Sequence, residues 1–305
     1  MKIYNNISEI IGNTPLIKLN KMAKGFDVLV KLENQNPGFS IKDRVAVSII
    51  NQAEADGLLK AGGAIIEATS GNTGIGLAII AAYRGYKLYI AMPESMSIER
   101  QKLLRHLGAE LVLTDPTLGM AGAIQKAEEL AKTLQNAFLT KQFSNKAAID
   151  IHYKTTGVEI FNDTDGLIDI FVTGVGTGGT LSGVGKALKE RKKDIEIIGV
   201  EPETSAVISK HAAGTHKIQG IGAGFIPENL LLDYVDSVIT VSNEEAFETA
   251  RRLAKEEGIL GGISSGANVA AALKLAAMPE NKDKKIVTTI CDTAERYLST
   301  ELFSE

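Results

Sequence analysis

The sequence predicts an α/β protein made of two parallel-sheet domains, with a ligand site in the cleft between them. Short apolar runs typical of buried strands alternate with amphipathic runs typical of helices. At two places, 69–74 and 174–180, a glycine-rich turn follows a strand and precedes a helix. Strands that alternate with helices form parallel sheets covered on both faces, and such sheets bind ligands at the carboxyl ends of their strands.

The first half of the chain contains four apolar runs of strand length. The expected strands are 28–32, 64–68, 88–92 and 110–114. The expected helices begin at Lys42 and cover 75–84, 97–107 and 121–134. This alternation predicts the first α/β domain.

The second half repeats the same rhythm. The expected strands are 168–174, 196–201, 237–241 and 285–290. The expected helices run from the second glycine-rich turn to about 190, and over 243–257 and 265–276. Segments 64–92 and 170–200 are alike in shape, since each consists of a strand, a glycine-rich turn, a helix and a strand. This likeness predicts a second, related domain.

Composition excludes several classes of function. The 305 residues are 44% hydrophobic and carry a net charge of −4, with scattered cations, which argues against a nucleic-acid or membrane-surface binder. The single cysteine, Cys291, excludes an internal disulfide and a cysteine-based zinc site. The four histidines lack ligand spacing, so no metal is expected. No signal core or membrane-length apolar run is present, so the cytoplasm is the expected location.

The stretch NPGFSIKDR, residues 36–44, places a lysine where a helix is expected to begin. Ser40 and Asp43 are three residues apart, which predicts a capping box before the apolar run VAVSII. Lys42 then lies at the positive end of the helix dipole, where an ammonium ion is disfavoured. Because a neutral amine is the form that attacks carbonyl groups, Lys42 is a candidate Schiff-base lysine.

The turn GTGGT, Gly176 to Thr180, has the features of a phosphate-binding loop. Its glycines let the backbone approach a ligand closely, and the helix that follows offers N–H groups and a positive dipole end. The threonines add hydroxyl donors. A tight turn without a ligand is the plainer interpretation, but the density of glycine between 174 and 179 favours phosphate binding.

A dinucleotide site is the rival interpretation of the same turn. Gly174, Gly176 and Gly179 match the pattern GxGxxG, and Glu201 ends the next strand, where an acid would bind a ribose. This alternative, an NAD-dependent dehydrogenase, leaves Lys42 and the other glycine-rich turn unexplained.

The turn TSGNTG, residues 69–74, presents hydroxyl and amide donors at another helix start. Such a loop can hold a carboxylate without an arginine, although ordinary helix capping would also explain it.

The stretch GISSGA, residues 262–267, contains Gly-x-Ser-x-Gly and raises the alternative of a serine hydrolase. The α/β-hydrolase order requires a histidine after the serine, and no histidine follows His216. That alternative therefore fails.

An amine nucleophile, a phosphate loop and a donor-rich second loop together suit a cofactor with one aldehyde and one phosphate. Pyridoxal 5′-phosphate is such a cofactor, and the second loop would then hold the carboxylate of an amino acid.

Long motifs carry a resemblance to a known family. The chain resembles the cysteine synthases, also called O-acetylserine sulfhydrylases, which are fold-type II pyridoxal-phosphate enzymes with a tryptophan synthase β-like fold. The resemblance runs from about 13 to 303. The motifs that carry it are NTPLIKLN, NPGFSIKDR, TSGNTGIGLA, MPESMSIERQKLLRHLGAELVLT, GVGTGGTLSGVGK, GIGAGFIP, GISSGA and ERYLSTELF.

The resemblance implies a role for each matching residue. Lys42 matches the Schiff-base lysine, Asn72 the residue that bonds the phenolic oxygen of the cofactor, and Ser264 the partner of the pyridine nitrogen. The phosphate loop matches Gly176, Thr177, Gly178, Gly179 and Thr180. The substrate-carboxylate site matches Thr69, Ser70, Thr73 and Gln142.

The resemblance also implies an activity and a domain arrangement. The expected reaction is β-replacement, in which sulfide displaces acetate from O-acetyl-L-serine to give L-cysteine. A smaller, mobile carboxylate-binding domain is expected over 36–146, and a larger phosphate-binding domain over 1–35 with 147–305. A homodimer is expected, and docking of the C-terminal tail of serine acetyltransferase is a further expected role.

Four residues depart from the pattern of the family. Lys146 replaces a proline beyond the carboxylate loop, and Cys291, Thr293 and Ala294 replace a proline, a serine and a glycine near the C-terminus. These changes leave open an alternative that consumes cysteine. Such an enzyme would release hydrogen sulfide and, with water or a second thiol, form serine, lanthionine or cystathionine.

Overall fold

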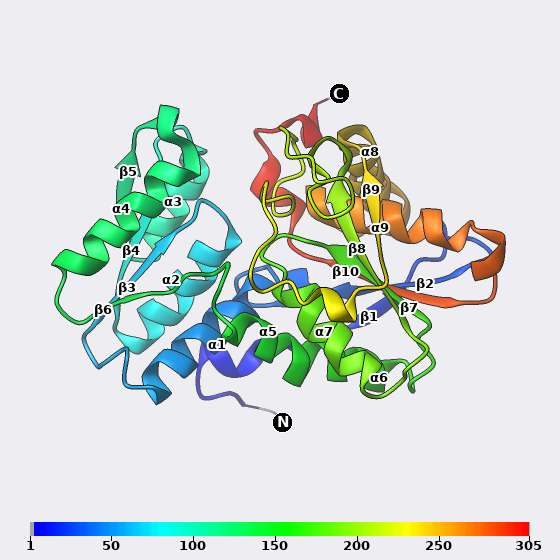
Figure 1. The fold of residues 1–305 in the computed structure, drawn as a ribbon, viewed down its shortest axis with the longest axis horizontal. Coiled ribbons are helices and arrows are strands. Elements are labelled where there is room, and N and C mark those ends of the chain that lie inside the picture. The colour runs from blue at the N-terminus through cyan, green and yellow to red at the C-terminus, as the bar shows by residue number, and fades with distance from the viewer. Residues whose placement is uncertain (1–2, 305) are drawn as a thin grey trace. The chain divides into compact units, whose positions relative to one another are not determined.

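The structure, a computed structural model, describes residues 3–304 (Figure 1). The chain forms two compact units. Unit 1 comprises Met1–Ile11 and Asn36–Ala148, and unit 2 comprises Gly12–Gln35 and Ile149–Glu305. Each unit contains one largely parallel sheet between helices, which confirms the expected fold class. The mobile, carboxylate-binding role assigned to 36–146 stays a prediction.

The sheet of unit 1 has four parallel strands in the order β5-β4-β3-β6. These strands are β3 (Ala64–Ala68), β4 (Lys87–Pro93), β5 (Glu110–Thr114) and β6 (Ala137–Leu139). The helices are α1 (Lys42–Ala55), α2 (Asn72–Arg84), α3 (Ile98–His106) and α4 (Gly119–Thr133), and α5 (Ala147–Ile151) lies at the unit boundary.

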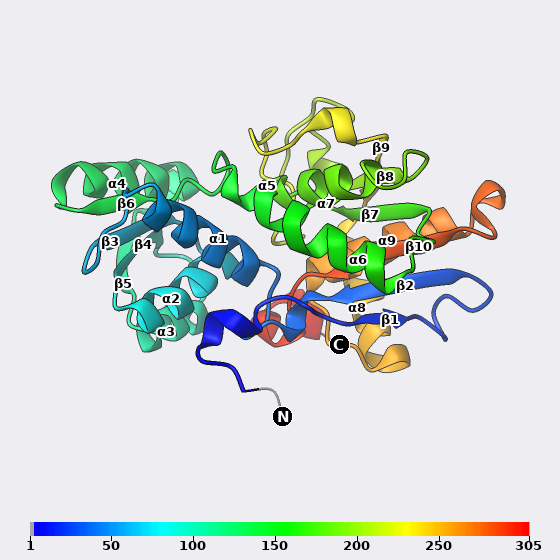
Figure 2. The same ribbon diagram turned by 90° about the horizontal axis from the view of Figure 1, so that it is seen from below.

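Successive side chains of β3 point to opposite faces of this sheet, and helices cover both faces. Ile65 packs into a core with residues of α1 and α2, whereas its neighbour Ile66 packs against Ala123 and Ala127 of α4. Figure 2 shows α4 on one side of the strands and α2 and α3 on the other. Because both faces are covered, β3 is buried along its whole length, as its apolar sequence predicts.

The sheet of unit 2 has six strands in the order β1-β2-β10-β7-β8-β9. They are β1 (Leu16–Lys18), β2 (Asp27–Leu32), β7 (Ile170–Gly174), β8 (Glu196–Pro202), β9 (Ser237–Val241) and β10 (Lys285–Ile290). Only the pairing of β1 with β2 is antiparallel among these strands. The helices are α6 (Gly157–Asp163), α7 (Gly179–Lys189), α8 (Asn243–Arg252) and α9 (Ile263–Ala276).

Two cores sandwich the sheet of unit 2. Val172 of β7 packs with residues of α8 and α9, whereas the adjacent Phe171 packs with residues of α6 and α7. The turns that follow β7 and β10 leave from the carboxyl edge of the parallel strands. The second glycine-rich turn therefore lies at the edge where α/β sheets bind ligands.

The start of α1 differs from the sequence prediction. The N-cap of α1 is Ile41, and no side chain caps it, so the predicted capping box between Ser40 and Asp43 is wrong. Ser40 Oγ instead accepts a hydrogen bond from the backbone N of Lys42 at 3.2 Å, and the Asp43 carboxylate accepts one from Gly38 N. The hydroxyl and the carboxylate both satisfy backbone donors, but not in the reciprocal pattern of a capping box.

The prediction from the sequence also omitted two short strands and placed some helix starts too late. β1 and β6 are three residues long, too short for a visible alternation of apolar and polar residues. α2 begins at Asn72 rather than 75, and α9 at Ile263 rather than 265. No helix within residues 3–304 is long and apolar enough to cross a membrane.

Candidate active site

Lys42 lies in the first turn of α1, as the sequence predicts. Its position in unit 1 is fixed by close packing of α1 on α2. A Cβ on Gly76 of α2 would lie 3.0 Å from the carbonyl oxygen of Lys42 and 3.1 Å from Cβ of Ala46. A side chain at Gly76 would crowd this contact, so the glycine lets the start of α1 lie close to the helix that follows the TSGNTG turn.

The TSGNTG turn connects β3 to α2 in the same unit. Thr69 and Thr73 are buried, whereas Ser70, Gly71 and Asn72 are partly exposed. Thr69 Oγ1 accepts a hydrogen bond from Gly71 N at 3.2 Å, and Ser70 O accepts one from Nη1 of Arg100 at 3.0 Å. The turn thus has a fixed backbone and an accessible tip at the N-terminus of α2, where anions bind favourably.

Gln142 joins this turn from a distant part of the chain. Thr73 Oγ1 donates a hydrogen bond to Gln142 Oε1 at 2.7 Å, and both side chains are buried. The two residues are 69 positions apart in sequence. The structure therefore brings together two of the four residues assigned to the substrate carboxylate, with Thr69 and Ser70 on the same turn.

Glu67 is a functional candidate that sequence reasoning missed. This carboxylate, on β3 just before the turn, is 4% exposed and accepts hydrogen bonds from Thr140 Oγ1, Gln142 N and Ala68 N. Burial raises the pKa of Glu67 from 4.5 to about 7, although these three hydrogen bonds act in the opposite direction. The signal in the sequence was the single charge within the apolar strand AIIEA.

The raised pKa of Glu67 predicts a pH-dependent stability. Between pH 4.5 and 7 the unfolded chain ionises Glu67 while the folded chain keeps it protonated, so stability falls as pH rises through this window. The loss approaches about 3 kcal/mol above pH 7. We expect Glu67→Gln to flatten this fall in chemical denaturation measured from pH 4.5 to 8. An unchanged pH profile in the variant would refute the assignment.

In unit 2, the GTGGT turn connects β7 to α7 and is enclosed by backbone on two sides. A Cβ on Gly176 would lie 2.3 Å from the carbonyl oxygen of Gly220, and one on Gly178 would lie 2.8 Å from Leu230 N. Gly178 also has φ +84°, a left-handed conformation that favours glycine. The glycines are therefore required to seat the turn against residues 220 and 230, with the N–H groups of the first turn of α7 at its end.

His152 supports this turn and was also missed by sequence reasoning. It is fully buried, with Nε2 3.2 Å from Thr180 Oγ1 and Nδ1 2.9 Å from Thr156 Oγ1. It lies in a π-helical turn, His152–Thr156, that packs on α7 where Gly183 leaves room for the His152 Cβ. No motif marks this histidine in the sequence, because its partner Thr180 is 28 residues away.

Ser264 lies in the first turn of α9 and is 3% exposed. A serine hydroxyl at a helix start can exchange a hydrogen bond with a ligand atom. A Cβ on Gly220 would lie 3.5 Å from Ser264 Oγ. Gly220 therefore borders both Ser264 and Gly176, so the residues assigned to the pyridine nitrogen and the phosphate flank one segment.

The donor set in these two units fits pyridoxal phosphate. A helix start with glycines and threonines suits the phosphate, the Ser264 hydroxyl at another helix start suits the ring nitrogen, and the Lys42 amine suits the aldehyde. No group of three His, Cys, Asp or Glu that could hold a metal ion occurs within the part of the chain that the structure describes.

The residues that depart from the family pattern are explained only in part. Cys291 is partly buried, with Sγ 3.3 Å from Asn268 Nδ2 and N donating to Ser265 Oγ at 2.9 Å. Thr293 forms an isolated bridge with Gly261, and Lys146 is exposed. Nothing in the structure explains why Ala294 replaces a glycine.

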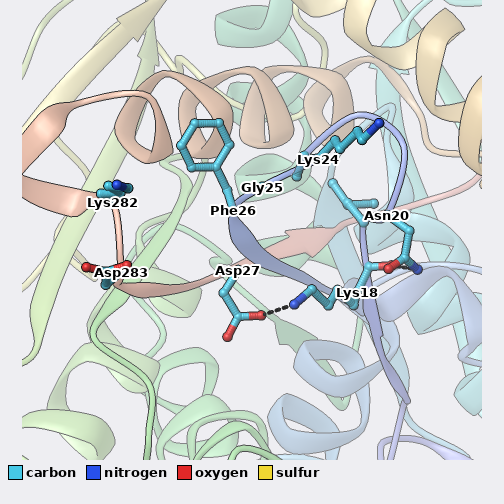
Figure 3. A pocket seen from close by; sticks show the side chains of 10 residues that line it. Lys18, Asn20, Lys24, Gly25, Phe26, Asp27, Lys282 and Asp283 are labelled. Atoms are coloured by element: carbon cyan, nitrogen blue, oxygen red, sulfur yellow. Dashed lines mark hydrogen bonds and ion pairs between the residues drawn. The ribbon is translucent and has the colours of Figure 1, made fainter.

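A pocket of about 430 Å³ lies elsewhere in unit 2 (Figure 3). It is lined by Lys18, Phe26, Asp27 and Lys282, among others, and Lys18 Nζ lies 2.8 Å from Asp27 Oδ1. Asp27 begins β2 and pairs in register with Lys285, which begins β10. The pocket is thus at the edge where the parallel strands start, opposite the edge that bears the glycine-rich turn.

Comparison with known proteins supports the cofactor. A family model described as pyridoxal-phosphate dependent enzyme matches residues 7–292. The chain belongs to this family. The family match confirms the cofactor expected from the sequence, pyridoxal phosphate. Two relatives match this chain over 97% and 92% of their own length.

Three members of the family illustrate the likeness. Cysteine synthase A of Escherichia coli K12 is 55% identical over 100% of this chain and 97% of its own. The crystal structure of cysteine synthase from Entamoeba histolytica is 47% identical, with a TM-score of 0.96 over 100% of this chain and 92% of that one. That of a hydrogen sulfide-producing enzyme from Fusobacterium nucleatum is 45% identical, with a TM-score of 0.93 over 98% and 99%.

Proposed function

We propose that this pyridoxal-phosphate enzyme is a cysteine synthase, which makes L-cysteine from O-acetyl-L-serine and sulfide. The observation that carries the proposal is the 55% identity to the Escherichia coli cysteine synthase A along the full length of both chains. The matching motifs place every residue assigned from the resemblance on a loop or a helix start. The residues assigned to the cofactor come from both units.

Pyridoxal phosphate supplies an aldehyde that captures amines and a ring that withdraws electrons from the α carbon of a bound amino acid. In this proposal Lys42 would hold the aldehyde through its Nζ, and the same atom, as a free amine, would accept the α proton of the substrate. Loss of the proton allows acetate to leave from the β carbon, and sulfide then adds there.

The phosphate is assigned to the GTGGT turn. The N–H groups at the start of α7 and the hydroxyls of Thr177 and Thr180 donate hydrogen bonds to it, helped by the positive end of the α7 dipole. Ser264 would hydrogen-bond the ring nitrogen, and Asn72 would bond the phenolic oxygen. The position of Ser264 beside Gly220, which also borders Gly176 of the GTGGT turn, supports this assignment.

The substrate carboxylate is assigned to the TSGNTG turn and Gln142. Thr69, Ser70 and Thr73 offer hydroxyls and backbone N–H groups, and Gln142 offers its amide Nε2. Thr73 Oγ1 donates to the amide oxygen of Gln142 at 2.7 Å, and Nε2 is the donor of the same amide that we assign to the carboxylate.

Product analysis tests the proposal. We expect kcat/KM for O-acetyl-L-serine with sulfide to exceed that for L-cysteine alone by about tenfold or more. The holoenzyme is incubated with each substrate set, and cysteine, serine, lanthionine, cystathionine and released sulfide are quantified. Faster turnover of cysteine alone would replace the proposal by its alternative, which the likeness to the Fusobacterium hydrogen sulfide-producing enzyme supports.

The dinucleotide alternative finds no support. Both carboxylate oxygens of Glu201 accept hydrogen bonds, from Ile208 N and Ser209 N at 2.9 Å each, rather than facing a ribose site. The family match also assigns a different cofactor.

The remaining expectations follow from the family and are proposed on that basis. They are a homodimer, a cytoplasmic location and docking of the C-terminal tail of a serine acetyltransferase. Sedimentation equilibrium tests the first, and a monomer at micromolar concentration would contradict it.

A further inference from the structure

Glu67 is a buried charge that the proposed chemistry does not use. It lies on β3, between the fully buried Ile66 and the start of the TSGNTG turn, and its side chain points into the interior of unit 1. An acid in this setting is costly, because burial disfavours its ionised form. An apolar residue of similar volume would pack such a strand at least as well.

The carboxylate of Glu67 accepts hydrogen bonds from both ends of a three-residue segment, 140–142, which follows strand β6. Oε2 accepts hydrogen bonds from Thr140 Oγ1 and from Gln142 N, the latter at 3.2 Å. Oε1 accepts one from its neighbour Ala68 N at 2.9 Å. Glu67 therefore links the end of β3 directly to the segment that follows β6.

The segment 140–142 needs such support. Lys141, between the two contact residues, has φ +52°, a left-handed conformation that disfavours residues other than glycine. Asn145 Nδ2 donates to Thr140 O at 2.9 Å, and Asn145 N donates to Lys141 O at 3.0 Å, so the segment forms a closed turn. Strained residues persist where surrounding contacts determine their conformation, as the two hydrogen bonds from this segment to Glu67 and the two from Asn145 to it do here.

The same segment carries Gln142, whose amide accepts from Thr73 Oγ1 at 2.7 Å. Glu67 thus fixes the backbone N of Gln142 while Thr73 fixes its side-chain oxygen. Two anchor points determine the direction of the remaining amide group, Nε2. Through Gln142, Glu67 on β3 is therefore linked to Thr73 at the far end of the TSGNTG turn.

We propose that Glu67 is a positioning residue for the substrate carboxylate: it holds the 140–142 segment so that the Gln142 amide is aimed at the site formed by Thr69, Ser70 and Thr73. This inference rests on the proposed function for the identity of the substrate. It adds a residue that acts through Gln142 and does not itself touch the amino acid.

The test compares Glu67→Gln with wild-type holoenzyme at pH 8. We expect the KM for O-acetyl-L-serine, and the Kd for L-serine read from the visible absorption of the cofactor, to rise roughly tenfold, while kcat changes by less than about twofold. Asp169→Asn is the matched control. Asp169 also ties two strands by accepting from Lys285 N at 2.8 Å, but at the opposite edge of the sheet of unit 2, so both constants should stay unchanged.

A double-mutant cycle separates positioning from general damage. If Glu67 acts through Gln142, Glu67→Gln should change the KM little in a Gln142→Ala background, because the group it aims is absent. An equal rise in both backgrounds, an unchanged KM and Kd, or a fall in kcat alone would overturn the inference. Should Glu67→Gln fail to fold, Thr140→Val removes only one donor to the carboxylate and should raise both constants by a smaller factor.

The L-serine titration distinguishes this inference from the proposed function. A wild-type enzyme that makes no cysteine but whose L-serine affinity drops in Glu67→Gln would refute the proposed reaction and support the positioning role. A wild-type enzyme that makes cysteine, with L-serine affinity unaffected by Glu67→Gln, would refute the positioning role alone. An L-serine titration without any spectral change in the wild type would refute the carboxylate site and the positioning role with it.

Discussion

Replacing Lys42 by alanine is expected to abolish covalent attachment of the cofactor and to lower kcat by about 10⁴-fold or more. In the proposed mechanism one atom, Lys42 Nζ, both holds the aldehyde and accepts the α proton, so the variant loses two functions together. Borohydride reduction of the holoenzyme followed by peptide mapping should place the label on Lys42 in the wild type and nowhere in the variant.

Lys42→Arg is the matched control for charge. It retains a cation at the start of α1, where Lys42 is partly buried, but a guanidinium group does not form the covalent bond. We expect it to be as inactive as the alanine variant while it retains the fold of unit 1, measured by circular dichroism. A reduced cofactor found on another lysine, or activity near wild type in either variant, would remove Lys42 from the proposed mechanism.

The fold could be predicted because each central strand is buried on both faces. β3, β4, β7 and β10 are almost wholly buried, so their sequences are mostly apolar rather than alternating between apolar and polar residues. The short edge strands could not be predicted in the same way. β1 is mostly exposed and β6 is partly buried, and both are paired on one side only, so neither leaves a distinctive pattern.

The assigned site residues could be predicted because most of them occupy the turns between a strand and a helix. Glycine at 176 and 178 follows from close backbone approach and left-handed geometry, both of which are local requirements that appear directly in the sequence. Lys42 and Ser264 likewise mark helix starts. Their roles in the reaction remain predictions that the experiments above test.

Glu67 and His152 could not be predicted because their importance depends on partners far away in the sequence. Glu67 contacts Thr140 and Gln142, which are 73 and 75 residues distant, and His152 contacts Thr180. Each of them supports a turn from behind rather than forming part of a motif. The capping box near Lys42 failed for a local reason, because Asp43 accepts from Gly38 N, five residues earlier, rather than capping α1.

Gly176→Ala should have the second large effect, a loss of cofactor affinity of about a hundredfold or more. A Cβ at 176 would lie 2.3 Å from the backbone carbonyl oxygen of Gly220, and a backbone atom cannot move aside as a flexible side chain can. Either the GTGGT turn or the segment at 220 must shift, and overpacking of this kind typically costs about 1–3 kcal/mol. The shift withdraws the N–H donors at the start of α7 from the phosphate and moves Gly220 relative to Ser264, so both ends of the proposed cofactor site are disturbed together.

Equilibrium titration of the apoenzyme with pyridoxal phosphate measures this effect, and Gly258→Ala controls for the strain of adding a side chain. Gly258 has φ +72° in the described structure, but a Cβ there would meet no atom within 4 Å. It should therefore lower the free energy of unfolding by about 1 kcal/mol without altering cofactor affinity. If Gly176→Ala bound pyridoxal phosphate as tightly as Gly258→Ala does, the phosphate would not depend on the GTGGT turn. Ser264 borders Gly220, the residue that a Cβ on Gly176 would strike. The assignment of Ser264 to the ring nitrogen would then lose its geometric support as well.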